Sequence, residues 1–296
     1  MAIIGMAAPL GAAGLFTGVE IMIWSSEELD LDAYLARIGY AGPVAADLET
    51  LRELQRAHVA AIPFENLEVA LGRHVPLDLK SLQAKLVGRR RGGYCYEQNS
   101  LFAAVLERIG FQVSGRGARV RANAARRRPV THAVLVVTVD GEPWLADTGF
   151  GAGGILEPVR LRDGVVVQQG GWTYGITMED EGIHVLRTLG PEGWADAYAF
   201  APQTLYPEDF TVMNHYSSTH PQSRFVGQVV AQKPGPQVRH TLLRGELSVS
   251  HTNGTHERRR VPPGELISVL DEIFGIGLDT EDAARLRALG ELNEVS

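Results

Sequence analysis

The segment Arg91-Gly92-Gly93-Tyr94-Cys95-Tyr96-Glu97-Gln98-Asn99 contains the only cysteine of the chain. Its two consecutive glycines allow a tight backbone turn into a following helix, which places Cys95 in the first turn of that helix. The free N–H groups and the positive dipole end at this position favour a thiolate over a thiol, and Arg91 adds positive charge nearby. The segment therefore predicts a nucleophilic cysteine, and the alternative is a helix that begins with a buried, unreactive one.

Outward from this segment, apolar residues recur at helical spacing between Trp24 and Gly110. Four helices are predicted, and Asp30, Asp47 and Asp78 are placed to cap the first three. The fourth follows the two glycines. Its apolar positions are Leu101, Phe102, Val105, Leu106 and Ile109. The expected helix ends are Gly39, Pro63, Gly88 and Gly110.

After Gly110 the apolar period changes to that of strands. Valine-rich segments span 111–120 and 130–139, and Asp140-Gly141 is the signal for a two-residue hairpin turn before Trp144. Short apolar runs separated by glycine continue to about residue 200. This pattern predicts a small β-barrel or sandwich.

The last third of the chain mixes both patterns. A hairpin is expected around Asn253-Gly254, with His251 and His256 facing each other across it. A metal site at these histidines would need more ligands, and a single cysteine argues against a zinc cluster, so no metal site is predicted. The expected segments are the hairpin at 241–259 and helices at 265–274 and 281–289.

His132 is the best candidate among nine histidines for a base that activates the thiolate. A strand histidine with a purely structural role is the alternative. If Asp140-Gly141 forms a two-residue loop, Asp147 pairs opposite Val134 and shares a face with His132. Their backbones then lie ~7–8 Å apart, which two polar side chains can bridge, whereas an odd-length loop would place them on opposite faces. The pattern predicts Cys95 as nucleophile, His132 as base and Asp147 as the group that orients the base.

The stretch 147–154 contains four glycines. Such a loop lets a ligand approach the backbone closely, and its exposed N–H groups can hold a phosphate. It is not a P-loop, because no Gly-Lys-Ser/Thr follows, and a flexible connection between strands is the alternative.

Composition excludes several classes of protein. The 296 residues, 45% of them hydrophobic, can bury a sizeable core in one to three units. With 28 basic and 35 acidic residues the net charge is −7, which argues against nucleic-acid binding. One cysteine allows no intrachain disulfide, and a cytoplasmic location is expected. Residues 1–22 lack Lys and Arg and are interrupted by Gly and Pro, so we interpret them as a disordered or non-native leader rather than a signal or membrane span.

At these residues the chain resembles the arylamine N-acetyltransferase family. Segment 91–99 matches the family's nucleophile motif R-G-G-x-C-x-E-x-N at every fixed position. The resemblance covers about residues 23 to 290. Further matches are Ile62-Pro63-Phe64-Glu65-Asn66-Leu67, Thr131-His132, Asp147-x-Gly149-Phe150-Gly151, and Ser218-Thr219-His220-Pro221 followed by Phe225.

The resemblance implies an α+β fold on a cysteine-proteinase-like scaffold. It implies an N-terminal helical bundle at 23–110 that carries the catalytic cysteine, a central β-barrel at 111–210 that carries the histidine and aspartate, and a C-terminal α/β lid at 211–296. It also implies that Cys95, His132 and Asp147 form the catalytic triad. The sequence gives no indication of the oligomeric state.

The resemblance further implies acetyl transfer from acetyl-CoA to a small arylamine, arylhydrazine or hydrazine, as in xenobiotic metabolism. The expected scheme is ping-pong, with an acetyl-cysteine intermediate and no tightly bound cofactor. The residues expected near CoA or the acceptor are Thr131, Phe150, Gly151, Phe225 and Phe64. Glu97 and Asn99 are expected to support the site through hydrogen bonds. The basic residues expected to meet the CoA phosphates, or else to form a solvated loop, are Arg116, Arg119, Arg121 and Arg126 to Arg128.

Three other functions fit the same residues. An amide synthase that closes a macrolactam would be indifferent to acetyl-CoA. A cysteine hydrolase would release CoA rapidly without an amine. A non-catalytic small-molecule binding protein would leave Cys95 inert to alkylation.

Overall fold

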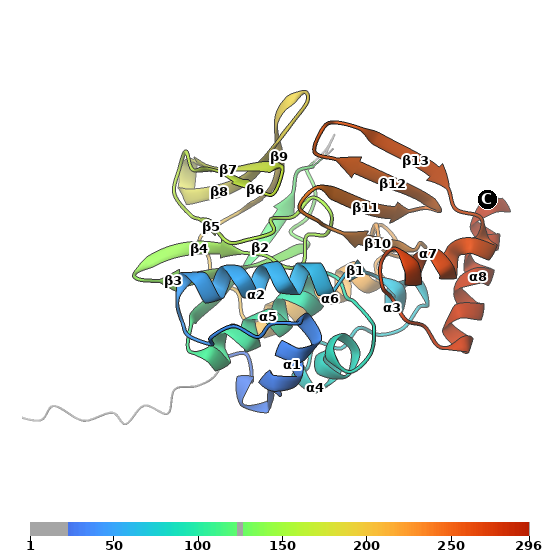
Figure 1. Ribbon diagram of the computed structural model, residues 1–296, viewed down its shortest axis with the longest axis horizontal. Coiled ribbons are helices and arrows are strands. Elements are labelled where there is room, and N and C mark those ends of the chain that lie inside the picture. The colour runs from blue at the N-terminus through green and yellow to red at the C-terminus, as the bar shows by residue number, and fades with distance from the viewer. Residues whose placement is uncertain (1–22, 123–126, 296) are drawn as a thin grey trace, which may run out of the picture.

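The computed structural model describes residues 23–122 and 127–295, so the predicted leader at 1–22 lies outside the described residues. The fold is α+β, as predicted: helices, a nearly closed eight-stranded barrel and a second, five-stranded sheet. Figure 1 shows the helices from the first third of the chain beneath the barrel, and the second sheet beside the barrel with α7 (Leu266–Glu272) and α8 (Thr280–Val295) at its outer end.

Aspartate caps begin three helices of the first third, as predicted. Asp30, Asp47 and Asp78 accept hydrogen bonds from the third residues of α1, α2 and α4. The helices are η1 (Ser26–Glu28), α1 (Leu31–Ile38), α2 (Leu48–Ala61), α3 (Leu67–Ala70), α4 (Leu79–Leu82), a π-helical turn η2 (Gln83–Val87) and α5 (Cys95–Ile109). The helical segment predicted from Asp78 to Gly88 is present, but it changes after Leu82 from α4 to the π-helical turn.

Helix α5 lies at the centre of the fold, and every residue from Cys95 to Leu106 is buried. Burying one leucine or phenylalanine side chain stabilises a fold by roughly 1.5–3 kcal/mol. The helix that carries the cysteine is therefore among the most firmly held elements of the molecule.

The barrel sheet has the strand order β5-β4-β3-β2-β9-β8-β7-β6. The two-residue turn at Asp140-Gly141 is confirmed, since Val139 pairs with Glu142 and both turn residues have positive φ. The strands are β2 (Gln112–Val120), β3 (His132–Val139), β4 (Glu142–Ala146), β5 (Val159–Arg160), β6 (Val166–Gln169), β7 (Trp172–Glu179), β8 (Ile183–Gly190) and β9 (Gly193–Phe200), with a 3₁₀ turn at Asp180–Gly182.

The second sheet has the order β1-β10-β11-β12-β13 and takes its first strand, β1 (Phe64–Glu65), from the helical third of the chain. Sequence analysis missed this strand. The remaining elements are α6 (Pro207–Thr219), β10 (Val230–Lys233), β11 (Val238–Leu243), β12 (Glu246–His251), β13 (His256–Arg260), a 3₁₀ turn at Pro263–Glu265, α7 (Leu266–Glu272) and α8 (Thr280–Val295).

Two details of the predicted hairpin at 241–259 were wrong. Its first residues belong to β11, and His256 pairs with Ser250 instead of facing His251. His251 donates its backbone N–H to the carbonyl oxygen of Thr255, which leaves three residues between this pair and moves the register by one. The two histidines therefore point to opposite faces.

Candidate active site

Cys95 is the first residue of α5, as the glycines before it predicted. Gly92 packs so closely on the preceding chain that a Cβ would lie 2.0 Å from the carbonyl oxygen of Pro63, which only glycine allows. The Cys95 side chain is buried, and its Sγ lies 3.9 Å from the carbonyl oxygen of Thr131. The tight turn thus aims the sulfur at the start of β3.

His132 and Asp147 meet as the hairpin register predicted. The Nε2 atom of His132 lies 2.7 Å from Oδ2 of Asp147, and both side chains are buried. Leu135 pairs with Ala146, so Asp147 continues the ladder opposite Val134. With Nε2 engaged by the carboxylate, Nδ1 of His132 is the nitrogen left for Cys95.

Burial and neighbouring charges set the protonation states of His132 and Asp147. Burial disfavours a charged imidazole, but the Asp147 carboxylate outweighs it and, with the Cys95 sulfur, raises the pKa of His132 to about 10. Burial likewise opposes ionisation of Asp147, yet His132 and hydrogen bonds from Asn99 and Gly149 hold the pKa of Asp147 below its ordinary value. The arrangement favours an imidazolium beside the sulfur, which is the charge state that stabilises a thiolate.

Asn99 fixes the aspartate from the next turn of α5. Its Nδ2 donates to Oδ1 of Asp147 at 3.0 Å, and its Oδ1 accepts the N–H of Thr148 at 3.0 Å. Gly149 follows so closely that a Cβ there would lie 2.5 Å from the Cα of Cys95. The glycine-rich loop therefore packs its backbone against Cys95.

Sequence analysis missed Tyr198, whose ring centroid lies 4.9 Å from that of His132. Burial and the nearby Asp147 carboxylate raise the pKa of Tyr198, but its buried hydroxyl makes no hydrogen bond of normal geometry to the described residues. No local signal marks this residue, because β9 comes close to β3 only through β2, which pairs with both strands.

A cavity of about 320 Å³ opens onto Cys95 and His132. Four of the five residues expected near the substrates line it: Phe64, Thr131, Phe150 and Phe225. Gly151 is not among the described residues that line it, and instead lies against Gln232, to whose Oε1 Ala152 donates its N–H. Gln232 lines the cavity and was not predicted.

The cations near the cavity differ from those expected. Arg121 pairs with Glu179 and Asp196 on the barrel, and Arg126 lies outside the described residues. Of the basic residues expected to meet phosphate, Arg128 is the one in the described segments that lines the cavity. Arg224 lines the same cavity and two adjoining ones of about 350 and 590 Å³, both of which Arg244 also lines.

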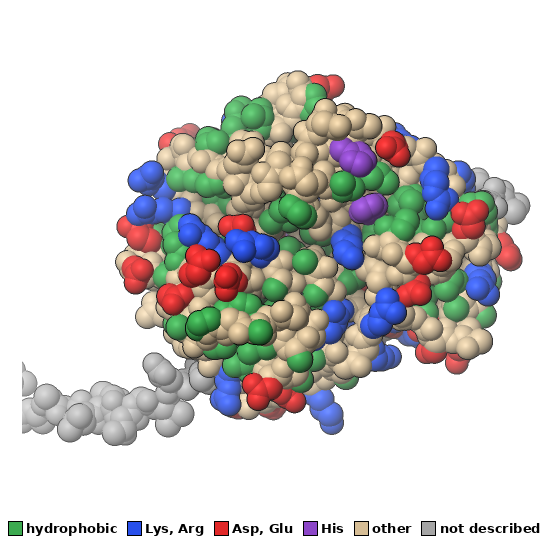
Figure 2. Space-filling view, viewed as in Figure 1, with side chains coloured by type: hydrophobic (Ala, Val, Ile, Leu, Met, Phe, Trp, Pro, Cys, Tyr) green, Lys and Arg blue, Asp and Glu red, His purple; other side chains and the backbone are tan. Residues whose placement is uncertain are grey.

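Arg224 and Arg244 make no ion pair within residues 23–122 and 127–295. On the face shown in Figure 2, by contrast, basic and acidic side chains are mostly interspersed. Arginines left without a carboxylate beside a cavity are suited to an anionic ligand.

Comparison with known proteins agrees with this geometry. The sequence profile of the N-acetyltransferase family matches residues 47–283. The arylamine N-acetyltransferase of Escherichia coli K12 is 36% identical over 258 residues, which cover 84% of this chain and 89% of that protein. The chain belongs to the arylamine N-acetyltransferase family.

Solved structures of other arylamine N-acetyltransferases share the fold. The Nocardia farcinica enzyme superimposes with a TM-score of 0.86 at 45% identity, covering 90% of this chain and 97% of that chain. The Mycobacterium marinum enzyme, solved in complex with CoA, gives a TM-score of 0.80 at 34% identity over 89% of this chain and 98% of that chain. In this family member, no helix in the described segments is long and apolar enough to cross a membrane.

Proposed function

We propose that this protein transfers an acetyl group from acetyl-CoA to the nitrogen of an arylamine, arylhydrazine or hydrazine, with Cys95, His132 and Asp147 as its catalytic triad. The contact between His132 and Asp147 beside the Cys95 sulfur carries the proposal. The family relationship and the CoA complex of the Mycobacterium marinum enzyme support acetyl-CoA as the donor. A thiol that must stay reduced suits the cytoplasm.

In the first half-reaction the Cys95 thiolate attacks the thioester carbonyl carbon. The tetrahedral oxyanion collapses, the bond from carbon to the CoA sulfur breaks, and His132 gives its proton to the departing sulfur. The N–H of Cys95 makes no hydrogen bond to the described residues, so it is the proposed oxyanion donor. One such donor typically contributes ~3 kcal/mol to the transition state.

In the second half-reaction the acceptor nitrogen attacks the carbonyl carbon of acetyl-Cys95. His132 takes the proton of the nitrogen, and the carbon–sulfur bond breaks to return the Cys95 thiolate. Asp147 holds the imidazole in place and stabilises its charged form in both steps. The thiolate–imidazolium pair is restored after each cycle.

The lining of the cavities divides the substrate between two environments. Phe64 and Phe225, whose rings lie 5.9 Å apart, form an apolar wall near Cys95 that suits an aromatic amine, with Phe150 against His132. Arg224, whose guanidinium carbon lies 6.0 Å from the centroid of the Phe225 ring, and Arg244 line the adjoining cavity and would meet the CoA phosphates.

The structure also bears on the proposed units at 23–110, 111–210 and 211–296. The first supplies Cys95, the second supplies His132 and Asp147, and the third supplies Arg224 and Arg244. Because β1 of the first unit is a strand of the third unit's sheet, we propose that these units fold as one cooperative body.

Intact-protein mass spectrometry with acetyl-CoA and no amine tests this function. We expect a gain of one acetyl group that maps to Cys95, is absent in Cys95→Ala, and is removed by an arylamine or hydrazine. A wild-type protein that neither gains the group nor releases CoA with an amine present would contradict acetyl transfer. Indifference to acetyl-CoA combined with reaction toward a larger acyl thioester would instead favour the amide-synthase alternative.

A further inference from the structure

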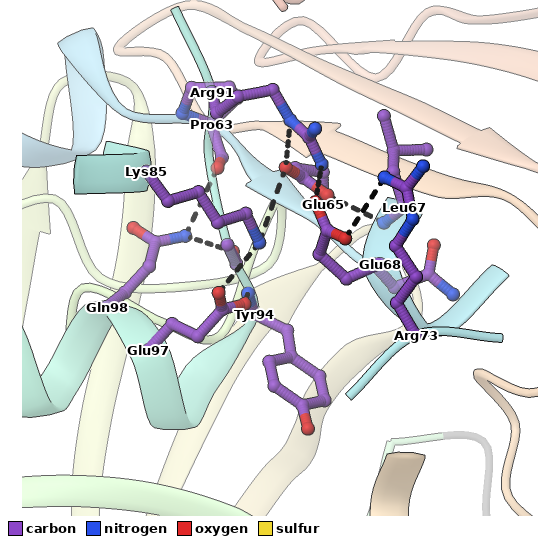
Figure 3. Close-up of polar contacts among 12 residues, drawn as sticks. Pro63, Glu65, Leu67, Glu68, Arg73, Lys85, Arg91, Tyr94, Glu97 and Gln98 are labelled. Carbon is purple, nitrogen blue, oxygen red and sulfur yellow. Dashed lines mark hydrogen bonds and ion pairs between the residues drawn. The ribbon is translucent and has the colours of Figure 1, made fainter. Parts of the chain in front are cut away.

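Behind the turn that presents Cys95 lies a group of buried or partly buried charged side chains, drawn in part in Figure 3. We call it the rear cluster, and none of its members lines the cavity at Cys95. Its members are Glu65, Glu68, Arg73, Lys85, Arg91, Glu97 and Asp282. They come from β1, α3, the chain after α3, the π-helical turn, the segment before α5, α5 and α8.

Lys85 bridges two of the carboxylates. Its Nζ lies 2.7 Å from Oε1 of Glu97 and 3.7 Å from Oε1 of Glu65, and the lysine side chain is 8% exposed. The π-helical turn buries Lys85 together with Leu86, whereas Lys80, on the preceding α4, is exposed. Isolated π-helical turns often occur where a side chain serves a function.

Glu97 connects this lysine to the nucleophile turn. Its Oε2 accepts the N–H of Tyr94, the residue before Cys95, at 3.1 Å, while its Oε1 contacts Lys85. On the other side, the N–H of Glu65 donates to the carbonyl oxygen of Gly93 at 3.1 Å. Both glutamates that Lys85 contacts therefore bond a residue just before Cys95, Glu97 through its carboxylate and Glu65 through its backbone.

Charge gives the lysine a second role. Glu97 is buried two positions from Cys95, where a carboxylate without a cation would oppose a thiolate. Arg91 is engaged elsewhere, by Glu65 at 2.9 Å and Glu68 at 3.1 Å. Burial raises the pKa of Glu97 and Lys85 opposes this, so the ammonium is the nearest group that keeps Glu97 ionised.

We propose that Lys85 is a positioning residue for the nucleophile: its ammonium neutralises the buried Glu97 carboxylate, which holds the Tyr94 amide and thereby the turn that presents Cys95. The role in acetyl transfer rests on the proposed function. The charge balance itself does not, because it concerns the reactivity of the Cys95 thiol with any electrophile.

The test is the pH profile of Cys95 alkylation by iodoacetamide in Lys85→Met, Glu97→Gln and the double variant, with Lys80→Met as the matched control. Lys85→Met leaves a negative charge near Cys95, so its profile should move to higher pH by about 1 or more. Glu97→Gln leaves a positive charge, so its profile should move to lower pH. The double variant and Lys80→Met should stay close to the wild type.

Shifts of the pH profile in opposite directions in the two single variants, with no net shift in the double variant, would support the proposal. Loss of stability alone would not shift the two profiles in opposite directions. Unchanged profiles, movements in one direction, or a double variant as displaced as Lys85→Met would overturn it. If Lys85→Met does not fold, Glu97→Gln decides by the direction of its movement. Because iodoacetamide needs no acetyl-CoA, this result stands apart from the mass-spectrometric test of acetyl transfer.

Discussion

Two groups of buried charges flank Cys95, and they differ in what they face. The front pair, His132 and Asp147, contacts the cavity through its histidine. The rear cluster around Lys85 does not line that cavity, and its charges pair with one another across elements from β1 to α8. Both contain fully buried carboxylates and both have shifted pKa values. Burial and a shifted pKa therefore do not separate the proposed catalytic pair from the rear cluster, whereas access to the cavity at Cys95 does.

The largest effect should come from the front pair. Asp147→Asn retains the shape of the side chain but cannot stabilise an imidazolium, so the rate of acetyl-Cys95 formation should fall about 10³–10⁴-fold. Single-turnover mass spectrometry measures this rate. The matched control is Asp282→Asn, the same change at the buried aspartate of the rear cluster, which should stay within about threefold of the wild type. Similar losses of this rate in both variants would show that the front pair and the rear cluster do not differ in their effect on acetylation.

The rear cluster should matter most for stability. Arg91→Met leaves Glu65, which is 0% exposed, without its closest cation, and should lower the free energy of unfolding by about 3–5 kcal/mol. Arg121→Met removes two ion pairs of partly exposed side chains on the barrel, with Glu179 and Asp196, and should lower the free energy of unfolding by at most about 1 kcal/mol. Urea unfolding compares the two variants. Equal losses in the free energy of unfolding would show that the buried ion pairs of the rear cluster matter no more for stability than those on the barrel surface.

Two buried histidines beside α5 should give opposite pH dependences. Burial lowers the pKa of His58 to about 3, so below pH 6.5 the unfolded chain binds a proton that the folded chain does not, and stability falls. The free energy of unfolding should fall by about 2 kcal/mol between pH 6.5 and 5 because of His58. The pKa of His132 is raised to about 10, so its contribution is full below pH 6.5 and is lost as the pH rises toward 10.

Unfolding free energies across pH 5 to 10 test this pair. We expect His58→Gln to flatten the acid side of the profile and His132→Gln to flatten the alkaline side. A variant that flattens the opposite side would reverse the assignment of the two shifts.

The smallest effect separates two neighbours of Asp147. Tyr198→Phe removes a hydroxyl that makes no aligned hydrogen bond to the described residues, so the free energy of unfolding should change by less than about 1 kcal/mol. Asn99→Ala removes the amide that bonds Asp147 and Thr148, and should slow acetylation at least about tenfold. Single-turnover acetylation compares the two variants. A larger loss of acetylation rate in Tyr198→Phe than in Asn99→Ala would show that the tyrosine, not the asparagine, supports Asp147.

The front pair could be predicted from sequence because its geometry is local. Asp140-Gly141 fixes a two-residue turn, the turn fixes the register, and the register places His132 and Asp147 on one face. The helix caps Asp30 and Asp47 could be predicted for the same reason, since each accepts a hydrogen bond from an N–H only three residues away. Within such short distances along the chain, side-chain chemistry decides the structure.

The rest depended on contacts between distant segments. Phe64 and Glu65 carry no strand signal of their own and become a strand because β10 pairs with them. Lys85 has the pattern of an ordinary helical residue in the sequence, and only the fold brings the carboxylates of β1 and α5 next to it. Arg224 gains its place at the cavity from the chain between α6 and β10. Each of these needs a partner that no local pattern identifies.

The strand β1 also governs when the site can exist during synthesis. Its neighbour Asn66 bonds Val230 from both backbone and side chain, across 164 residues. At ribosomal speeds of about 5–20 residues per second, that segment takes on the order of 10–30 s to emerge. Until then β1, which bonds the turn before Cys95, lacks its partner strand. A nascent chain should therefore hold its only thiol in an unfinished turn and acquire a reactive nucleophile only near the end of translation.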